Sequence, residues 1–269
     1  MANATFRQTL LKENFNQIDL VKSHHLIHSD ADFSFDLMIK QHPNVPDGIA
    51  ILGKAGKMPI LFDLSDPRPG SILVVNDHLP SIRKFFTVIM RSIIEFSHSS
   101  GVQFITISHY PDKWMDTIQG FDPQFVFCAG VSGEYEKSAE DWIFYLAKKA
   151  EDRRSGKNNG PAAILFLDDW NLIINFDIKT KLNFEWLVKY GASARIWVIS
   201  GLDVSKENEI HPNLNLFKTK IFEYIVQKRQ VINQLDIPMG MIRDLAPERN
   251  FLTKIGANWI RFWAPKLQG

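Results

Sequence analysis

The sequence is short of the features that mark several classes of protein. Its 269 residues include one cysteine, Cys128, which excludes an internal disulfide framework and a multi-cysteine metal site and fits a reducing compartment. Apolar runs fall well short of the ~20 residues that a membrane-spanning helix needs. The first residues, MANATFRQTLLKENFNQ, lack the apolar stretch of a signal peptide. We therefore expect a soluble, cytoplasmic protein with no membrane partner.

An excess of charge of one sign is also lacking. The 31 basic and 30 acidic residues leave a formal net charge of +1. Non-specific DNA binding depends on clustered Lys and Arg. A net charge near zero does not indicate DNA as a partner, but it does not exclude DNA either. The hydrophobic fraction of 45% and the charged fraction of 23% are those of an ordinary globular protein. A chain of this length can bury a sizeable core.

From about residue 70 onward, short apolar runs alternate with amphipathic segments. We predict strands at residues 71–75, 102–107, 125–128, 162–167, 195–200 and 220–226. We predict helices at residues 81–96, 113–118, 138–154 and 182–190, the third with Ser138 as its N-cap. Buried strands that alternate with helices predict a mainly parallel α/β sheet with helices on both faces.

The first part of the chain has a different pattern. We predict a strand at residues 32–39 and a hairpin of residues 49–52 and 59–64 around the basic loop GKAGK. The C-terminal segment ANWIRFWAP is interpreted as an edge strand or a final packing segment. The sequence thus predicts a small β-rich subdomain over residues 1–69 and an α/β core over residues 70–269.

The segment that follows the first core strand lacks what a phosphate-binding loop requires. Such a loop needs glycines, a Lys for the terminal phosphates and a Ser or Thr for magnesium. No glycine occurs between Gly70 and Gly101, and Pro80 has no backbone N–H to offer. The residues at this place are Asn76, Asp77, His78, Leu79, Pro80, Ser81, Ile82, Arg83 and Lys84. The last two could attract an anion at the helix start, although solvated surface charges are the favoured interpretation.

Paired acids follow the most hydrophobic strand. Asp168 and Asp169 come directly after AAILFL, which is the pattern of a Walker B segment that orients magnesium and the attacking water. The alternative is that one of these acids caps the turn into Trp170. Arg153 and Arg154 end a predicted helix and could act in trans on a neighbouring subunit, or complement the helix dipole as surface residues.

Other candidates have simpler explanations. His24, His25 and His28 lie in a polar stretch without a paired acid at ligand spacing, so we interpret them as surface residues rather than a metal site. Cys128 is interpreted as a small buried hydrophobe.

The order of these segments resembles the FtsK–HerA group of DNA-pumping ATPases. The hairpin GKAGKMPILFDLSDPRPGSILVVNDHL precedes a long helix and VQFITIS, and a helix ending in EDRR leads to the paired acids. The resemblance covers roughly residues 47–230 and implies a RecA-like P-loop NTPase fold. In the alignment that the resemblance implies, Ile82 stands at the position of the phosphate-loop Lys. If the alignment is shifted by two residues, Lys84 stands there instead. Ser200 and Gly201 stand in place of the Thr-Gln sensor.

These departures favour a non-catalytic ATPase-like protein with a structural or assembly role and no cofactor. The resemblance implies a homo-oligomer, by analogy a hexameric ring. The alternative is a divergent NTPase or DNA-translocase subunit that binds ATP and magnesium through Arg83, Lys84 and Asp168, with a neighbour's Arg153 or Arg154 as the missing cation. A DNA-binding accessory factor without nucleotide is a third interpretation.

Overall fold

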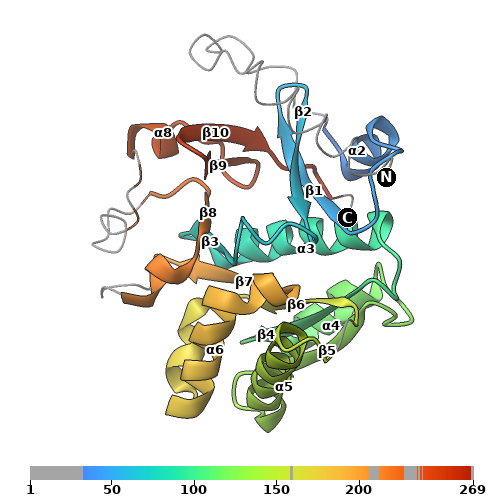
Figure 1. The fold of residues 1–269 in the computed structure, drawn as a ribbon. Helices are drawn as coiled ribbons and strands as arrows, with labels where there is room; N and C mark the ends of the chain where they lie inside the picture. Colours follow the sequence, from blue (N-terminus) through green and yellow to red (C-terminus); the bar gives the residue numbers. More distant parts are fainter. Residues whose placement is uncertain are drawn as a thin grey trace.

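The computed structural model describes residues 33–157, 160–205, 212–226, 235, 237 and 239–267. His24, His25 and His28 lie outside these residues. Figure 1 shows the chain as one sheet with helices packed against it.

The α-helices of the described residues are α2 (Phe35–Gln41), α3 (Leu79–Phe96), α4 (Pro111–Gln119), α5 (Lys137–Arg154), α6 (Ile178–Tyr190) and α8 (Met239–Arg243). Three short 3-10 helices are η1 (Trp170–Asn175), η2 (Gly191–Ala194) and η3 (Pro212–Leu216).

The sheet has ten strands in the order β2-β1-β10-β9-β8-β3-β7-β6-β4-β5. The strands of the core are β3 (Ile72–Asn76), β4 (Val102–Ser108), β5 (Cys128–Gly133), β6 (Ala162–Leu167), β7 (Ile196–Asp203) and β8 (Thr219–Phe222). The others are β1 (Ile49–Ala55), β2 (Met58–Asp63), β9 (Asn250–Ile255) and β10 (Asn258–Trp263). Neighbours from β8 to β5 pair in parallel, and neighbours from β2 to β8 pair antiparallel. The predicted mainly parallel α/β core is therefore confirmed.

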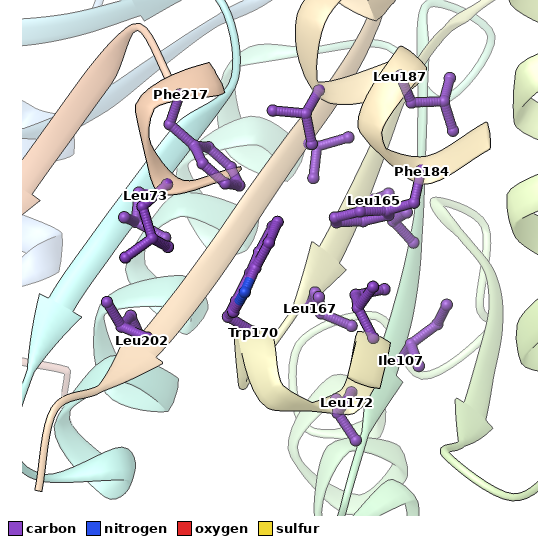
Figure 2. Close-up of a cluster of buried hydrophobic side chains, with 14 of the residues drawn as sticks. Leu73, Ile107, Leu165, Leu167, Trp170, Leu172, Phe184, Leu187, Leu202 and Phe217 are labelled. Atoms are coloured by element: carbon purple, nitrogen blue, oxygen red, sulfur yellow. The ribbon is translucent and has the colours of Figure 1, made fainter. Parts of the chain in front are cut away.

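Both faces of the parallel strands are buried, as their continuous apolar runs predict. Alternate residues of β3 point to opposite faces of the sheet. Leu73 packs in the core beneath α5 and α6, and Val74 packs in the core beneath α3 and α4. Figure 2 shows part of the first core, where the Trp170 ring lies between β7 and α6 and stands edge-on to Phe217.

The hairpin predicted at residues 49–64 is present, but it is not separate from the core sheet. Strand β1 pairs with β10 through Lys54 and Trp263, and β10 continues into β9. The Ile51 backbone N–H also donates to the Ser92 hydroxyl of α3 at 2.7 Å in a buried position. The boundary at residue 69 stays a prediction, while β1 and β2 extend the sheet of the core.

Residues 32–39 were predicted as a strand, and that prediction is wrong. Residues 35–41 form helix α2, with Ser34 as the N-cap whose hydroxyl accepts the Leu37 N–H at 3.2 Å. The buried residues Phe35 and Met38 are three apart, which is a helical spacing. The pattern seen in the sequence therefore belongs to a short amphipathic helix of about two turns.

Other predicted limits also differ: β8 ends at residue 222 instead of 226, and α6 begins at residue 178 instead of 182. Three further differences concern β5, α5 and the C-terminal segment. Strand β5 spans residues 128–133 instead of 125–128. The Asp122 carboxylate accepts the N–H groups of Val126 and Phe127, which lie in the loop before the strand, and that of Cys128, the first strand residue. Helix α5 starts at Lys137 with Glu136 as N-cap, so the predicted cap at Ser138 is wrong. The segment ANWIRFWAP forms β10 inside the sheet, between β1 and β9, and not at an edge.

Candidate functional site

Polar side chains gather where the parallel strands end. Because the carboxyl ends of parallel strands meet at one edge of a sheet, residues that follow these strands become neighbours. They are Glu223 after β8, Asn76 at the end of β3, Asp203 at the end of β7, Asp168 and Asp169 after β6, His109 after β4 and Glu134 after β5. We call this row the carboxyl edge; carboxylates predominate in it.

The turn from β3 into α3 occupies the place of the phosphate loop and is closed by its own side chains. Asn76 is buried, and its Oδ1 accepts the His78 N–H at 2.9 Å. The Asn76 amide nitrogen donates to the Glu223 carboxylate. His78 Nδ1 lies 3.1 Å from the Ser81 hydroxyl. The Asn76 amide and the His78 N–H thus face partners within the chain.

The first turn of α3 presents apolar side chains to the sheet. Pro80 lies in this turn and has no N–H, and the Ser81 N–H donates to the His78 carbonyl at 3.0 Å. Leu79 and Ile82 are both buried. The helix terminus therefore offers few of the free N–H groups that bind phosphate elsewhere.

Ile82 packs on Gly201 of β7. A Cβ atom at Gly201 would lie 2.7 Å from Ile82 Cγ2 and closer still to the carbonyl oxygen of Asp168. Only glycine fits at this position without a shift of its neighbours. The position that the resemblance assigns to the phosphate-loop Lys is thus a tightly packed apolar contact between α3, β6 and β7.

The two basic residues at the start of α3 have neighbours of their own. Lys84 Nζ lies 2.7 Å from Glu248 Oε2 in an ion pair at the surface. The Arg83 guanidinium lies over the Tyr110 ring, 5.1 Å from its centroid. The sequence-predicted residues Asn76, Asp77, His78 and Ser81 line one cavity of about 460 Å³, whereas Arg83 and Lys84 are not among its lining residues.

Acids dominate that cavity. Its lining includes the carboxylates of Asp77, Glu223 and Glu248. Burial raises the pKa of Glu223 to about 7, although hydrogen bonds from the Glu248 N–H and from Asn76 oppose the shift. Asp77 Oδ2 accepts the Val226 N–H at 2.7 Å. A cavity lined in this way repels phosphate groups above neutral pH.

Asp168 lies deep in the protein at the end of β6. Its Oδ2 accepts the Ser108 hydroxyl and the Trp114 indole N–H, the latter at 3.1 Å. Its Oδ1 has no hydrogen-bond partner among the residues that the structure describes. Burial raises the pKa of Asp168, which favours the neutral acid, and the nearby charges of His109 and Arg83 oppose this shift.

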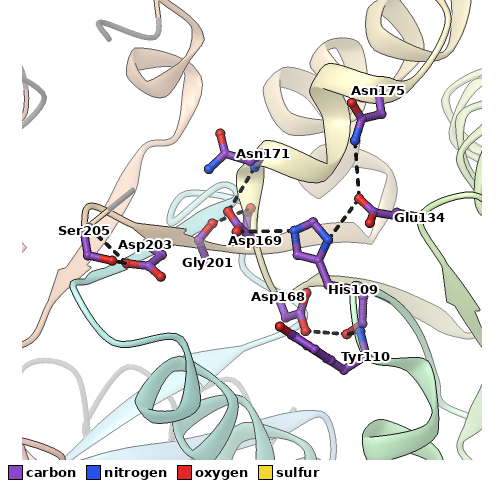
Figure 3. A network of polar contacts seen from close by, with 12 residues as sticks. His109, Tyr110, Glu134, Asp168, Asp169, Asn171, Asn175, Gly201, Asp203 and Ser205 are labelled. Atoms are coloured by element: carbon purple, nitrogen blue, oxygen red, sulfur yellow. Dashed lines mark hydrogen bonds and ion pairs between the residues drawn. The ribbon is translucent and has the colours of Figure 1, made fainter. Parts of the chain in front are cut away.

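Asp169 takes part in an ion-pair network that joins three strand ends. His109 Nε2 lies 3.4 Å from Asp169 Oδ2, and His109 Nδ1 lies 2.9 Å from Glu134 Oε2. Figure 3 shows the imidazole between the two carboxylates. The hydrogen bond with Asp169, followed by contact with Glu134, raises the pKa of His109 to about 9 against the effect of burial. His109 is therefore a cation at neutral pH.

Asp169 is also the N-cap of η1. Its Oδ1 accepts the Asn171 N–H at 3.1 Å, which is the capping geometry that the alternative interpretation described. A Walker B role for Asp168 and Asp169 stays a prediction. At the sensor position, Ser200 is buried in β7 and its hydroxyl donates to the Gly201 carbonyl at 3.2 Å.

Arg153 and Arg154 lie away from the carboxyl edge. Arg153 donates to the carbonyls of Ala194 and Arg195, at 3.0 and 3.1 Å, and to that of Pro161. These carbonyls immediately precede β7 and β6, at the opposite ends of the strands from Asp168. The Arg154 guanidinium lies over the rings of Trp186 and Tyr190. A trans-acting role for either residue stays a prediction.

The sequence analysis missed His109, Glu134 and Glu223. His109 directly follows an apolar strand, so the rule that ligands bind at carboxyl ends could have drawn attention to it. Glu223 lies inside the strand predicted at residues 220–226, and it follows a strand only because β8 ends at residue 222. Glu134 follows the strand whose limits were predicted too early, and nothing in its local sequence marks it.

Searches of family models and of curated proteins gave no match to this chain. Solved structures do match. The cytoplasmic domain of EssC superimposes with a TM-score of 0.62 at 10% identity, covering 88% of this chain and 48% of EssC. The cytoplasmic domain of the type VII secretion ATPase EccC from Thermomonospora curvata gives 0.64 at 12%, covering 82% and 29%. The pCW3 conjugation coupling protein TcpA, solved with ATPγS, gives 0.60 at 14%, covering 81% and 66%.

These likenesses show that the chain has the fold of FtsK–HerA-type P-loop ATPases. The chain spans about half the length of EssC and a smaller share of EccC. In the described part of the chain, no helix has the length and apolarity to cross a membrane. The same residues contain no group of three or more His, Cys, Asp or Glu side chains placed to hold a metal ion.

Proposed function

We propose that this chain is a non-catalytic ATPase-like protein of the FtsK–HerA type, with a structural or assembly role and no ATP hydrolysis. The observation that carries the proposal is the contact of Ile82 with Gly201 at the place of the phosphate-loop Lys. A Lys at residue 82 would bring an ammonium group into a fully buried apolar site, which is strongly unfavourable.

Electrostatics supports the same conclusion. Asp77, Glu223 and Glu248 line the cavity beside the turn from β3 into α3. A phosphate charge about 4 Å from one carboxylate would be repelled by roughly 4 kcal/mol at the effective dielectric near a protein surface. Among the described residues, Lys84 is already paired with Glu248, one of the acids that line the cavity. Binding of a triphosphate would have to overcome the repulsion by these carboxylates.

The acids after β6 are poorly suited to magnesium. Ionised carboxylates are the ligands that this cation prefers, whereas burial favours the neutral form of Asp168. Asp169 faces the protonated His109 instead. In our proposal the His109 cation takes the place that a magnesium ion would have beside the Walker B acids, and no cofactor is needed.

The proposal extends to assembly. FtsK–HerA-type proteins are expected to form rings, and we propose that this chain forms a homo-oligomer in the cytoplasm, by analogy a hexameric ring. The likeness in fold supports this part of the proposal only indirectly, because identities of 10–15% to the matched structures carry no interface residues with them.

Magnesium-ATP titration by calorimetry, with the mass in solution measured on the same sample, tests the proposal. We expect no heat of binding up to about 1 mM nucleotide. Micromolar binding that Lys84→Ala or Arg83→Ala weakens tenfold or more would show that a substitute phosphate site exists. The matched control is Lys113→Ala, which removes another cation beside Tyr110 without touching the start of α3.

The second candidate is a divergent ATP-binding DNA-translocase or NTPase subunit. Two observations favour it: Oδ1 of Asp168 has no partner among the described residues, and the charge of Arg83 acts on this carboxyl. Such an enzyme would hydrolyse ATP in the presence of magnesium and DNA, and Asp168→Asn would abolish the activity. No phosphate release above background from the wild-type protein excludes this candidate.

A further inference from the structure

A cavity of about 610 Å³ lies between α5 and the edge of the sheet that β5 forms. Figure 1 shows α5 beside β4 and β5, and residues of α5, β4, β5 and β6 line the cavity. Two of them, Gln103 and Ala163, are the second residues of β4 and β6. The cavity therefore reaches toward the amino ends of these strands, away from the carboxyl edge. We call it the α5 cavity.

The inner wall of the α5 cavity is apolar and partly aromatic. Ile105 and Leu146 belong to the core beneath α5 and line the cavity from inside. The rings of Trp142 and Tyr145 have centroids 5.7 Å apart and planes inclined at 81°. The indole lies against Gly130, where a Cβ would be 2.7 Å from Trp142 Cζ2. Two rings nearly at right angles offer a face and an edge to a third ring, so an aromatic group fits this wall.

Two hydrogen-bond donors meet at the rim of the α5 cavity. Lys149 Nζ donates to the Tyr145 hydroxyl at 3.3 Å and lies 5.2 Å from the centre of the Tyr145 ring. Because this hydroxyl accepts the bond from Lys149, its own hydrogen can still be donated, and the ammonium group has further hydrogens. Both residues line the cavity. The rim thus presents an ammonium group and a phenol O–H side by side.

The charge of Lys149 is not neutralised by an ion pair with an acid in the part of the chain that the structure describes. One carboxylate, that of Asp141, also lines the cavity. It is eight residues from Lys149 along α5, or about 12 Å, and it lies 3.9 Å from the ammonium group of Lys137. The end of the cavity at Lys149 therefore favours an anion.

We propose that the α5 cavity binds a small aromatic carboxylate. Its ring packs against Trp142 and Tyr145, and its carboxylate accepts hydrogen bonds from Lys149 Nζ and the Tyr145 hydroxyl. The two oxygens of a carboxylate suit two neighbouring donors, and hydrogen bonds with a charged partner are the stronger ones. Lys149 would repel a cation in the same place. Because exposed ion pairs contribute little free energy, the ring supplies most of the affinity and the carboxylate supplies the selectivity.

This inference goes beyond the proposed function. The α5 cavity has no lining residue in common with the turn from β3 into α3 or with the cavity beside that turn. Binding of a carboxylate there requires neither nucleotide nor assembly.

Titrations followed by nitrogen–proton correlation NMR test the proposal. The first probe is naphthoate, and the second is naphthylmethanol, which has the same rings and a neutral hydroxymethyl group. The indole N–H signal of Trp142, identified by its loss in Trp142→Phe, reports binding in the cavity. We expect naphthoate to bind with a dissociation constant below about 1 mM, as for a ligand of this size. Naphthylmethanol should bind at least about threefold more weakly.

Three variants locate the carboxylate and the rings. Lys149→Met removes the ammonium group and should weaken naphthoate binding at least about threefold without changing that of naphthylmethanol. The matched control is Lys148→Met, because this neighbouring lysine is exposed and does not line the cavity. Ala129 lines the cavity and is exposed, so Ala129→Trp should obstruct the cavity without disturbing the core and weaken the binding of both probes.

The outcomes are separable. A preference for the carboxylate that Lys149→Met abolishes and Lys148→Met preserves supports the proposal. It is overturned if the Trp142 signal does not move at about 1 mM of either probe, if both probes bind equally, or if the two lysine variants behave alike.

A third probe identifies the source of the carboxylate. N-acetyl-glycyl-phenylalanine carries an aromatic ring and a carboxylate at the end of a peptide. Binding at least about tenfold tighter than that of naphthoate would assign the α5 cavity to a chain terminus and overturn its assignment to a small acid. None of these titrations contains ATP, so their failure and the failure of the proposed function are distinguishable.

Discussion

At the scale of single residues, His109 is the main cation of the carboxyl edge. Its imidazole lies between Glu134 and Asp169, which follow the two strands that flank β4 in the sheet. One protonated side chain thus joins the ends of β4, β5 and β6. Such a cation offsets the repulsion between the two carboxylates.

His109→Gln should destabilise the protein in a pH-dependent way. The folded-state pKa of about 9 lies above the ordinary value of 6.5, so the stabilisation is fully present below about pH 6.5 and is lost as the pH rises through 9. After allowance for solvent screening, we expect the substitution to lower the free energy of unfolding by about 1–2 kcal/mol at pH 6. Urea denaturation of both proteins from pH 6 to pH 10 measures it. A difference that stays constant over this range contradicts the role of the charge.

Gly201 is the second decisive residue of the site. A Cβ at this position meets Ile82 Cγ2 and the Asp168 carbonyl oxygen, so Gly201→Ala should lower the free energy of unfolding by about 1–3 kcal/mol. Gly240→Ala is the control, because nothing lies within 4 Å of its Cβ position. Adding Ile82→Ala to Gly201→Ala should not restore stability, since the carbonyl contact remains. Chemical denaturation of the wild-type protein, the two single Gly→Ala variants and the double variant measures these differences in the free energy of unfolding.

At the scale of elements, Arg153 connects the end of α5 to the starts of β6 and β7. Its guanidinium donates to carbonyls that precede both strands. These hydrogen bonds are part-buried or exposed, and bonds from a charged group are stronger than those between neutral groups. A basic residue at this helix end is therefore more than a partner for the helix dipole. The sequence could not show this, because the acceptors lie 8 to 42 residues away along the chain.

Arg153→Ala should cost about 2–3 kcal/mol of stability, the range for hydrogen bonds from a charged group. Arg154→Ala should cost under about 1 kcal/mol, because its guanidinium stacks on aromatic rings at the surface. Thermal and urea unfolding of the two variants provide a matched comparison. The trans-acting interpretation predicts a different result. The two variants would then be equally stable, and each substitution would abolish an ATPase activity of the wild-type protein.

Much of the core could be predicted because its strands are continuous apolar runs. Residues 102–107 and 162–167 became β4 and β6 within one residue. Residues 32–39 and 125–128 were assigned wrongly, since in short segments Ser34 and Asp122 direct the backbone through side-chain hydrogen bonds. Periodicity does not detect such bonds.

The candidate site was predicted only in part. The lack of glycine between Gly70 and Gly101 and the acids after β6 are visible in the sequence. The pairing of His109 with Glu134 and Asp169, and of Asn76 with Glu223, depends on the strand order β8-β3-β7-β6-β4-β5. That order results from packing between distant segments, so no local pattern contains it.

At the scale of the whole molecule, the N-terminal hairpin is continuous with the core. Strand β1 packs against α3 and pairs with β10, and the buried hydrogen bond from Ile51 to Ser92 joins the two parts. Phe251 of β9 stacks with Phe85 of α3 and with Phe262 of β10 in the same core. Removing the hairpin would therefore expose a strand edge and part of this core.

We accordingly expect residues 1–269 to unfold in one cooperative transition, in which tryptophan fluorescence and far-ultraviolet circular dichroism coincide. A fragment of residues 70–269 should lose native near-ultraviolet signals or aggregate, because the β10 edge and the apolar face of α3 lose their cover. The two samples are compared by urea titration. If the fragment instead unfolds cooperatively at the midpoint of the full chain, residues 1–69 are a separate subdomain and the continuous sheet contributes little to stability. The expected result would make the hairpin part of the folding unit, so that any surface used for assembly is built on a single rigid sheet.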